Sequence, residues 1–283
     1  MTDALTAQQK DLLVYHLREA YMEIFPAPGI AERLDVLERN AYVAVTCSPT
    51  KGVDETLDVT ATLVSRGFRV APHIAARNVR DAGHVREILA RLRELRIDSI
   101  FVPGGDRPKP AGPYSTALEL LREIAERGHD LKDIGVAAHP EGHPSVDDAS
   151  LLDALRDKQP FATYLVTQMC FDAAALERWL RVIRSHGVSL PAWIGLPGAI
   201  DRGQLIKTSL RIGVGDSLRF LRKQVTAATT LMKSGEYTPG ALVRELAPLM
   251  ADADNGIAGY HLFCLNQVEK TESWRNAAIE ALR

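Results

Sequence analysis

The fold of this chain is decided by stretches such as Tyr42-Val-Ala-Val-Thr-Cys47, which is apolar on consecutive residues and becomes polar only toward its end. An apolar run without alternation is typical of a strand that is covered on both faces in a parallel sheet. Seven similar runs recur along the chain: Tyr21–Phe25, Arg69–His73, Ser99–Pro103, Ile134–Ala138, Thr163–Met169, Ala192–Leu196 and Ala258–Leu265. The sequence therefore predicts eight buried parallel strands.

Amphipathic stretches lie between these runs. Val79–Leu95 places its large aliphatic residues on one stripe and its arginines and acids opposite, as a surface helix does. Asp54 and Asp172 are expected to cap the helices that they open, and Gly67 and Gly187 fall just after the last turn. The other stretches with a helical period are Asp54–Ser65, Tyr114–Arg127, Ser150–Lys158, Asp172–Ser185 and Tyr237–Met250.

Eight strands that alternate with helices predict a closed (β/α)8 barrel of the TIM type, in one domain over residues 1–283. An open, doubly wound sheet has the same local pattern, but the strand count and the polar residues after almost every strand favour the barrel. Met1–Glu19 is expected to form an extra N-terminal helix that closes the bottom of the barrel. Asp201–Glu236 has an all-helical pattern, which predicts two or three helices after the seventh strand.

Composition and charge exclude several classes of protein. The chain is 46% hydrophobic with a formal net charge of −2, which offers no long-range attraction to nucleic acid or an anionic membrane. No apolar stretch reaches the ~20 residues that span a bilayer. Cys47, Cys170 and Cys264 have no metal-type spacing, so free thiols in a reducing compartment are expected. With a polar N-terminus unlike a signal peptide, this predicts a cytoplasmic protein, and the exposed helices of a barrel are compatible with a homo-oligomer.

Polar side chains follow most of the predicted strands, at the positions where a barrel carries its chemistry. Each one alone can be a solvated strand end or a helix cap. Together they predict an active site on the carboxyl-terminal face of the barrel. In chain order they are Glu23, Thr46, His73, Asp106, His139, Glu141, His143, Gln168 and Asn266.

Glu23 lies inside an apolar strand, between Met22 and Ile24. Desolvation favours the neutral form of a carboxyl group, which suits such a residue to general acid work near neutral pH. The alternative is a structural salt bridge with an arginine of the barrel.

Two loops have unusual composition. In the turn that ends at Asp106, the paired glycines Gly104 and Gly105 let the backbone approach a ligand and present amide N–H groups to it, although a plain tight turn has the same composition. In His139-Pro-Glu-Gly-His-Pro144, the prolines and the glycine exclude a helix, and with it the helical zinc pair of a metalloprotease. Two histidines with nearby acids could still bind a metal.

These segments occur in the same order in the methylenetetrahydrofolate reductase family, which the chain resembles over about residues 20 to 270. The segments that carry the resemblance are Met22-Glu-Ile-Phe-Pro26, Ala71-Pro-His73, Gly104–Asp106, His139-Pro-Glu-Gly-His-Pro144, Val166-Thr-Gln168 and, at the end of the eighth strand, His261-Leu-Phe-Cys-Leu-Asn266.

The resemblance implies FAD at the mouth of the barrel, reduced by NADH or NADPH, and a hydride passed from the flavin to the methylene carbon of methylenetetrahydrofolate. It implies that Glu23 is the general acid that helps to open the imidazolidine ring, and that Asp106 and Gln168 hold the pterin, with Asp106 also adjusting the flavin. Opening a cyclic aminal does need a proton donor. No metal is implied. The flavin pocket would comprise Thr46, His73, Gly104, Gly105, Asp106, His139, His143 and Lys158.

The chain departs from the family pattern at Pro103-Gly-Gly-Asp106, where Leu-Arg-Gly-Asp is usual, and at His139, where tyrosine is common. A flavin-free reductase is therefore an alternative. Two others are a non-catalytic folate or flavin binding subunit of a methyl-transfer system, and a metal-dependent hydrolase on the same barrel. The hydrolase would use His73, Asp106, His139 and His143 as ligands.

Overall fold

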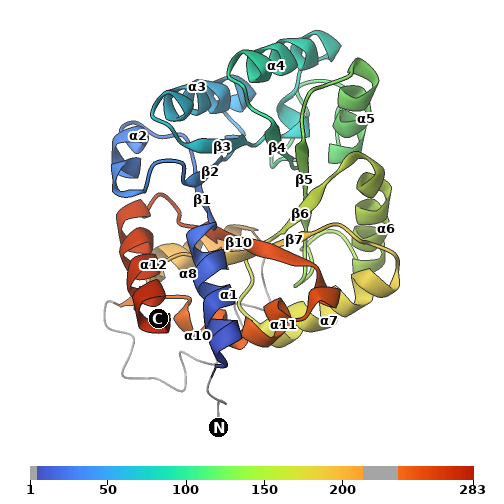
Figure 1. Ribbon diagram of the computed structural model, residues 1–283. Helices are drawn as coiled ribbons and strands as arrows, with labels where there is room; N and C mark the ends of the chain where they lie inside the picture. Colours follow the sequence, from blue (N-terminus) through green and yellow to red (C-terminus); the bar gives the residue numbers. More distant parts are fainter. Residues whose placement is uncertain (1–4, 213–234) are drawn as a thin grey trace.

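The computed structural model describes residues 5–212 and 235–283 and contains a barrel of parallel strands (Figure 1). Its eight strands are β1 (Tyr21–Ile24), β2 (Tyr42–Val45), β3 (Arg69–Pro72), β4 (Ser99–Val102), β5 (Asp133–Ala138), β6 (Tyr164–Thr167), β7 (Ala192–Pro197) and β10 (Ile257–Phe263). They are hydrogen-bonded in the order β3-β2-β1-β10-β7-β6-β5-β4. β3 and β4 complete the circle, because His73 bridges Phe101 and the Ile74 N–H donates to the Phe101 carbonyl at 2.8 Å. All eight predicted strands and the (β/α)8 barrel are confirmed.

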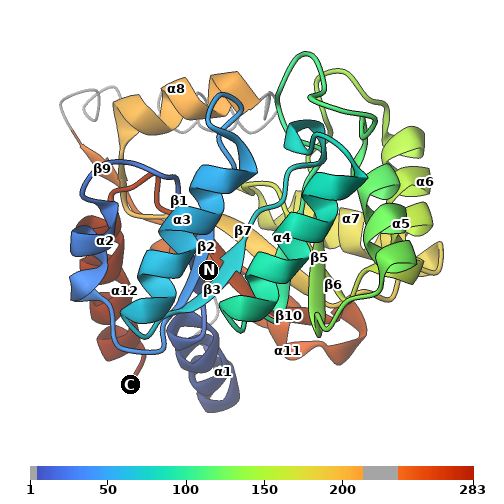
Figure 2. The same cartoon turned by 90° about the horizontal axis from the view of Figure 1, so that it is seen from above.

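Helices surround the strands (Figures 1 and 2). The α-helices are α1 (Ala7–Arg18), α2 (Ile30–Arg33), α3 (Gly52–Ser65), α4 (Ala82–Glu94), α5 (Ala117–Arg127), α6 (Asp148–Lys158), α7 (Ala173–Ser185), α8 (Arg202–Ile212), α10 (Gly240–Glu245), α11 (Ala247–Ala251) and α12 (Val268–Leu282). Short 3-10 helices are η1 (Leu34–Val36), η2 (Ala76–Asn78), η3 (Gln159–Phe161) and η4 (Ala253–Asn255). No helix of the described part of the chain is long and apolar enough to cross a membrane.

The extra N-terminal helix is confirmed as α1. Leu13 and Leu17 are fully buried, and the ring of His16 lies 6.3 Å from that of Tyr260 on β10. α1 also packs against α11 and α12, so it covers the amino-terminal end of the barrel beside these two helices and β10. Figure 2 shows α1 and α8 at opposite ends of the barrel.

Aromatic side chains fill the barrel interior toward its amino-terminal end. The rings of Tyr21 and Trp193 meet edge to face at 4.9 Å, although β10 lies between their strands, so this contact passes through the interior. Tyr164 donates its hydroxyl to the Ile100 carbonyl at 3.1 Å and occupies the space beside Gly135, where a Cβ would lie 2.3 Å from the ring. The packed aromatics form a floor, and the polar residues further along the strands lie on the carboxyl-terminal side of it.

Three local predictions need comment. Asp172 caps α7 as predicted, accepting from the Ala174 N–H at 2.8 Å, but the cap predicted at Asp54 is wrong because α3 already begins at Gly52. The single helix predicted over Tyr237–Met250 is two helices, since Pro248 in the first turn of α11 has no N–H to continue α10.

After β7 the structure adds two short antiparallel strands that the sequence did not predict, β8 (Ile200–Asp201) and β9 (Glu236–Tyr237). Within the stretch predicted to be all-helical, α8 confirms a helix over Arg202–Ile212. Residues 213–234 of that stretch lie outside the described residues.

Candidate active site

The predicted site residues lie at the carboxyl-terminal face of the barrel, as expected for residues that end parallel strands. Glu23 is in β1, and the others follow strands directly or lie in the loop after one. Thr46 follows β2, His73 follows β3, Asp106 lies in the loop after β4, His139 and His143 lie in the loop after β5, Gln168 follows β6 and Asn266 lies just beyond β10. Lys158, the last residue of α6, reaches back to β5 through a hydrogen bond from its Nζ to the Ala137 carbonyl at 3.0 Å.

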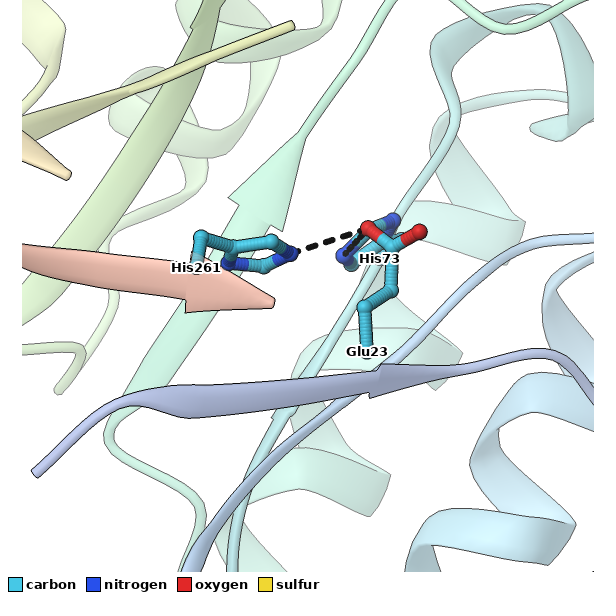
Figure 3. A group of neighbouring side chains, drawn as sticks. All are labelled: Glu23, His73 and His261. Atoms are coloured by element: carbon cyan, nitrogen blue, oxygen red, sulfur yellow. Dashed lines mark hydrogen bonds and ion pairs between the residues drawn. The ribbon is translucent and has the colours of Figure 1, made fainter. Parts of the chain in front are cut away.

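Glu23 forms a cluster with His73 and a histidine that sequence reasoning gave no role, His261 on β10 (Figure 3). Glu23 Oε2 lies 2.9 Å from His261 Nε2, a hydrogen-bond distance, and 3.8 Å from His73 Nε2, which is too long for one. The side chain of Glu23 is 14% exposed, and those of His73 and His261 are 7% and 4% exposed. The carboxyl group is therefore largely desolvated, as predicted, but its partners in the described chain are histidines and not an arginine.

Neighbouring rings fix both imidazoles. The ring of His261 stacks on Tyr21 at 6.0 Å and lies 5.1 Å from Phe263, and the ring of His73 lies 4.6 Å from Phe101. Desolvation by burial lowers the pKa of His73 to about 4, and its Nε2 has no hydrogen-bond partner in the described part of the chain. His73 is therefore neutral near pH 7, and among the residues that the structure describes only His261 hydrogen-bonds the carboxyl group.

The donor atoms of this cluster lie within 4.8 Å of one another, and one carboxylate with two imidazoles is a common zinc donor set. The distance between Glu23 Oε2 and His261 Nε2 favours a hydrogen bond between these atoms over a metal ion coordinated by both. Ligand atoms about 2.1 Å from a tetrahedral zinc stand about 3.4 Å apart, whereas Glu23 and His261 are 2.9 Å apart. The cluster also differs from the predicted hydrolase ligands, since within the described chain only His73 of that set belongs to a group with metal-type spacing.

The end of β1 is tied to the end of β10. Asn266 has a φ of +59° and binds the backbone of Phe25 twice, its Oδ1 accepting from the N–H and its Nδ2 donating to the carbonyl, both at 2.9 Å. The Cys264 thiol donates to the Glu23 carbonyl at 2.9 Å. Asn266 therefore holds the backbone beside Glu23, which gives this polar strand end a structural role.

The glycine turn after β4 packs on the loop after β3. Gly105 has a φ of +91°, and a Cβ there would lie 2.9 Å from the Cβ of Ala75, so the turn requires glycine for internal reasons. A Cβ on Gly104 would meet nothing within 4 Å. Asp106 is exposed, and its carboxylate forms no hydrogen bond or ion pair with any described residue.

Arg77 holds this turn in place, and sequence reasoning did not identify it. Its guanidinium donates to the carbonyls of Arg107 and Pro108, both at 2.6 Å, and to that of Ser115 at 3.2 Å. The loop that carries Asp106 is therefore anchored although Asp106 itself is not.

The loop after β5 carries two histidines, His139 and His143, and Lys158 lies near them. The rings of His139 and His143 meet edge to face at 5.2 Å. Desolvation, followed by the charges of His143 and Lys158, lowers the pKa of His139 to about 4, and desolvation lowers the pKa of Lys158 to about 8. No carboxylate of the described residues forms an ion pair with Lys158, and the carboxylate of this loop, Glu141, accepts from the Phe171 N–H at 2.9 Å.

Gln168 and Thr46 have simpler surroundings. The Oε1 of Gln168 accepts from the Met169 N–H at 2.8 Å, and its amide nitrogen donates to no described residue. The carbonyl of Thr46 accepts from the Thr56 hydroxyl at 3.1 Å. The Thr46 hydroxyl itself forms no hydrogen bond with a described residue.

Comparison with known proteins identifies the family. The family model "Methylenetetrahydrofolate reductase" matches residues 26–200. Methylenetetrahydrofolate reductase (NADH) 1 of Arabidopsis thaliana is 26% identical over 264 residues, which cover 84% of this chain and 43% of that protein. The 5,10-methylenetetrahydrofolate reductase of Salmonella typhimurium is 27% identical over 241 residues, which cover 81% of this chain and 77% of that protein. The Pectobacterium carotovorum enzyme of the same name is 26% identical, with 81% and 76% covered.

The chain spans only 43% of the Arabidopsis protein, and it is 30% identical to methylenetetrahydrofolate reductase 2 of Schizosaccharomyces pombe over 130 residues, which cover 40% of this chain and 20% of that protein. Among solved structures, tryptophan synthase from M. tuberculosis superposes with a TM-score of 0.51 at 12% identity, covering 97% of this chain and 99% of that one, which is a likeness of fold alone. Because the family match extends over more than half of the chain, the protein belongs to the methylenetetrahydrofolate reductase family.

Proposed function

We propose that the chain interconverts 5,10-methylenetetrahydrofolate and 5-methyltetrahydrofolate, with FAD as hydride carrier and NADH or NADPH as reductant. The observation that carries this proposal is the carboxyl group of Glu23, held desolvated inside the mouth of the barrel of a family member. The other polar strand ends support it, because they offer binding groups on the same face.

The chemistry explains why such a carboxyl group is needed. The methylene carbon of the substrate bridges two nitrogens, and reduction to a methyl group breaks one carbon–nitrogen bond. The departing nitrogen must take a proton, and the carbon must take a hydride. Glu23 donates the proton to that nitrogen, as a general acid held at the mouth of the barrel.

Asp106 and Gln168 suit the pterin. A pterin edge presents N–H donors together with acceptor atoms, and it is complementary to a carboxylate and a side-chain amide. Asp106 has an unpaired carboxylate, and Gln168 has an amide nitrogen that donates to no described residue. Both residues bind and orient the substrate so that the nitrogen to be protonated faces Glu23.

The charge of the proposed flavin pocket supports the binding of FAD. FAD carries a diphosphate, and Lys158 is a desolvated cation whose hydrogen-bond partner among the described residues is a backbone carbonyl and not an acid. His139 and His143 add imidazole nitrogens beside it. Thr46, His73, Gly104 and Gly105 line the neighbouring strand ends, and Gly104 leaves its backbone open to a close approach. When bound, the flavin supplies the hydride.

An anaerobic spectroscopic titration tests the proposal. The purified protein is mixed with FAD, then with NADH or NADPH, and finally with methylenetetrahydrofolate, while the visible absorption is recorded. We expect a bound flavin that bleaches with the nicotinamide and recovers with the folate, with 5-methyltetrahydrofolate as product. Product formed without any flavin bound would favour the flavin-free reductase instead. Binding of folate or flavin without product would favour the non-catalytic subunit.

A further inference from the structure

His261 makes a direct contact with Glu23 that the proposed function does not use. Its Nε2 lies 2.9 Å from Glu23 Oε2, and the residue is 3% exposed. Figure 3 shows the imidazole directed at this one oxygen, while the other carboxyl oxygen, Oε1, points away from the ring. The two oxygens of Glu23 are therefore not equivalent.

No other titratable group of the described chain forms a hydrogen bond with the carboxyl group of Glu23. The titratable groups that face the pair are His73 on β3, Tyr21 on β1 and the Cys264 thiol beyond β10. His73 stands 3.8 Å away, and burial lowers its pKa to about 4. Burial raises the pKa of Tyr21 to about 12 and that of Cys264 to about 12, so both stay protonated and neutral at pH 7. Stabilisation of a carboxylate on Glu23 is left to His261.

We propose that His261 is the positioning residue of the general acid: its Nε2–H donates to Glu23 Oε2, so that Oε1 carries the proton that is delivered to the folate nitrogen. This inference rests on the proposed function, in which Glu23 donates a proton.

The proton transfer makes the role of His261 stronger as the reaction proceeds. The Oε1–H bond breaks, the proton joins the departing nitrogen, the carbon–nitrogen electron pair stays on that nitrogen, and Glu23 becomes a carboxylate. The hydrogen bond from His261 to Oε2 is neutral before the transfer and charge-assisted after it, and charge-assisted hydrogen bonds are the stronger kind. Such an interaction lowers the barrier because it is stronger in the transition state than in the ground state.

Three variants test the role. In His261→Gln the amide nitrogen takes the place of Nε2 and keeps the donor, whereas in His261→Asn the amide reaches only the place of Nδ1. The matched control is His16→Asn, the same change at a buried histidine at the amino-terminal end of the barrel. We expect kcat to fall about 10- to 100-fold in His261→Asn, the equivalent of one hydrogen bond to a charged group. KM for the folate should be unchanged, and His261→Gln should recover most of the loss.

The pH profile gives a readout that a purely structural role would not move. A hydrogen bond to the carboxylate favours its charged form, so its loss keeps the proton on Glu23 to a higher pH. The alkaline decline of kcat should therefore move to higher pH in His261→Asn and stay in place in His261→Gln and His16→Asn. Thermal unfolding of each variant shows whether a loss of activity comes from loss of folding.

A measurement on the ligand-free protein separates this inference from the proposed function. In a nitrogen-15 histidine spectrum we expect one slowly exchanging, downfield Nε2–H signal that disappears in His261→Gln and moves in Glu23→Leu. Active wild type together with equal kcat in all three variants overturns the role of His261 and leaves the function standing. Wild type without reductase activity overturns both, even if the signal is present. A stoichiometric zinc ion in the wild type that is lost in His261→Asn also overturns the inference.

Discussion

The packing of the glycine turn that carries Asp106 can be tested by substitution, because Gly105 is tightly packed whereas Gly104 faces open space. In Gly105→Ala an L-residue must adopt a φ of +91°, and its Cβ would lie 2.9 Å from the Cβ of Ala75. The backbone conformation costs about 1–2 kcal/mol, and the overpacked contact costs about 1–3 kcal/mol. The sum is a loss of about 2–5 kcal/mol in the free energy of unfolding.

The matched control is Gly104→Ala. Its Cβ would meet nothing within 4 Å and its φ is not in the left-handed region, so its stability should stay within about 0.5 kcal/mol of the wild type. For a domain of this size, 1 kcal/mol moves the melting temperature by about 2–4 °C. Calorimetry without added cofactor should therefore show a fall of at least about 4 °C in Gly105→Ala and less than about 2 °C in Gly104→Ala. Equal melting temperatures in the two variants would refute the assignment of Gly105 to internal packing.

Two further variants probe the loops around the site. In Arg77→Met the carbonyls of Arg107, Pro108 and Ser115 lose their hydrogen-bond donor. KM for the folate should therefore rise, whereas kcat, which depends on Glu23, should change less. An unchanged KM in steady-state kinetics would contradict the anchoring role of Arg77. Lys158 has a pKa of about 8, so its cation is present below pH 8 and is lost as the pH rises through that value. Fluorescence titration should therefore show FAD binding that weakens above pH 8 in the wild type. In Lys158→Met the binding should be weak at all pH values. The same pH dependence in both proteins would remove Lys158 from the flavin site.

The barrel could be predicted because its physical requirements are visible in single stretches of sequence. Helices cover the outer face of each strand, so residues such as Val43 and Ile100 are fully buried, and aromatic rings such as those of Tyr21 and Trp193 pack in the interior. Runs without alternation follow directly from this arrangement. The two-residue strands β8 and β9 were missed because two residues show no periodicity.

The candidate site could be predicted only in part. Glu23 stands out as a carboxyl group in an apolar run, and His261 is equally conspicuous as a polar residue in the run that forms β10. Their pairing joins positions 238 residues apart and depends on β1 lying beside β10, which no local pattern reveals. For the same reason the sequence did not reveal that the partners of Glu23 among the described residues are histidines and not an arginine. Arg77 was missed because its role is to bind carbonyls, which leave no signature in the sequence.

The most direct test of the central claim is the oxidative half-reaction of Glu23→Gln. The variant is reduced anaerobically with NADH and mixed with methylenetetrahydrofolate in a stopped-flow instrument, and flavin reoxidation is followed by absorbance. Glutamine keeps the size and polarity of the side chain but has no acidic proton, and general acid catalysis contributes about 10²- to 10⁴-fold. We expect reduction by NADH at the wild-type rate and reoxidation by the folate slowed by at least about 100-fold, with folate binding retained. Reoxidation at the wild-type rate would contradict the assignment of Glu23 as the general acid.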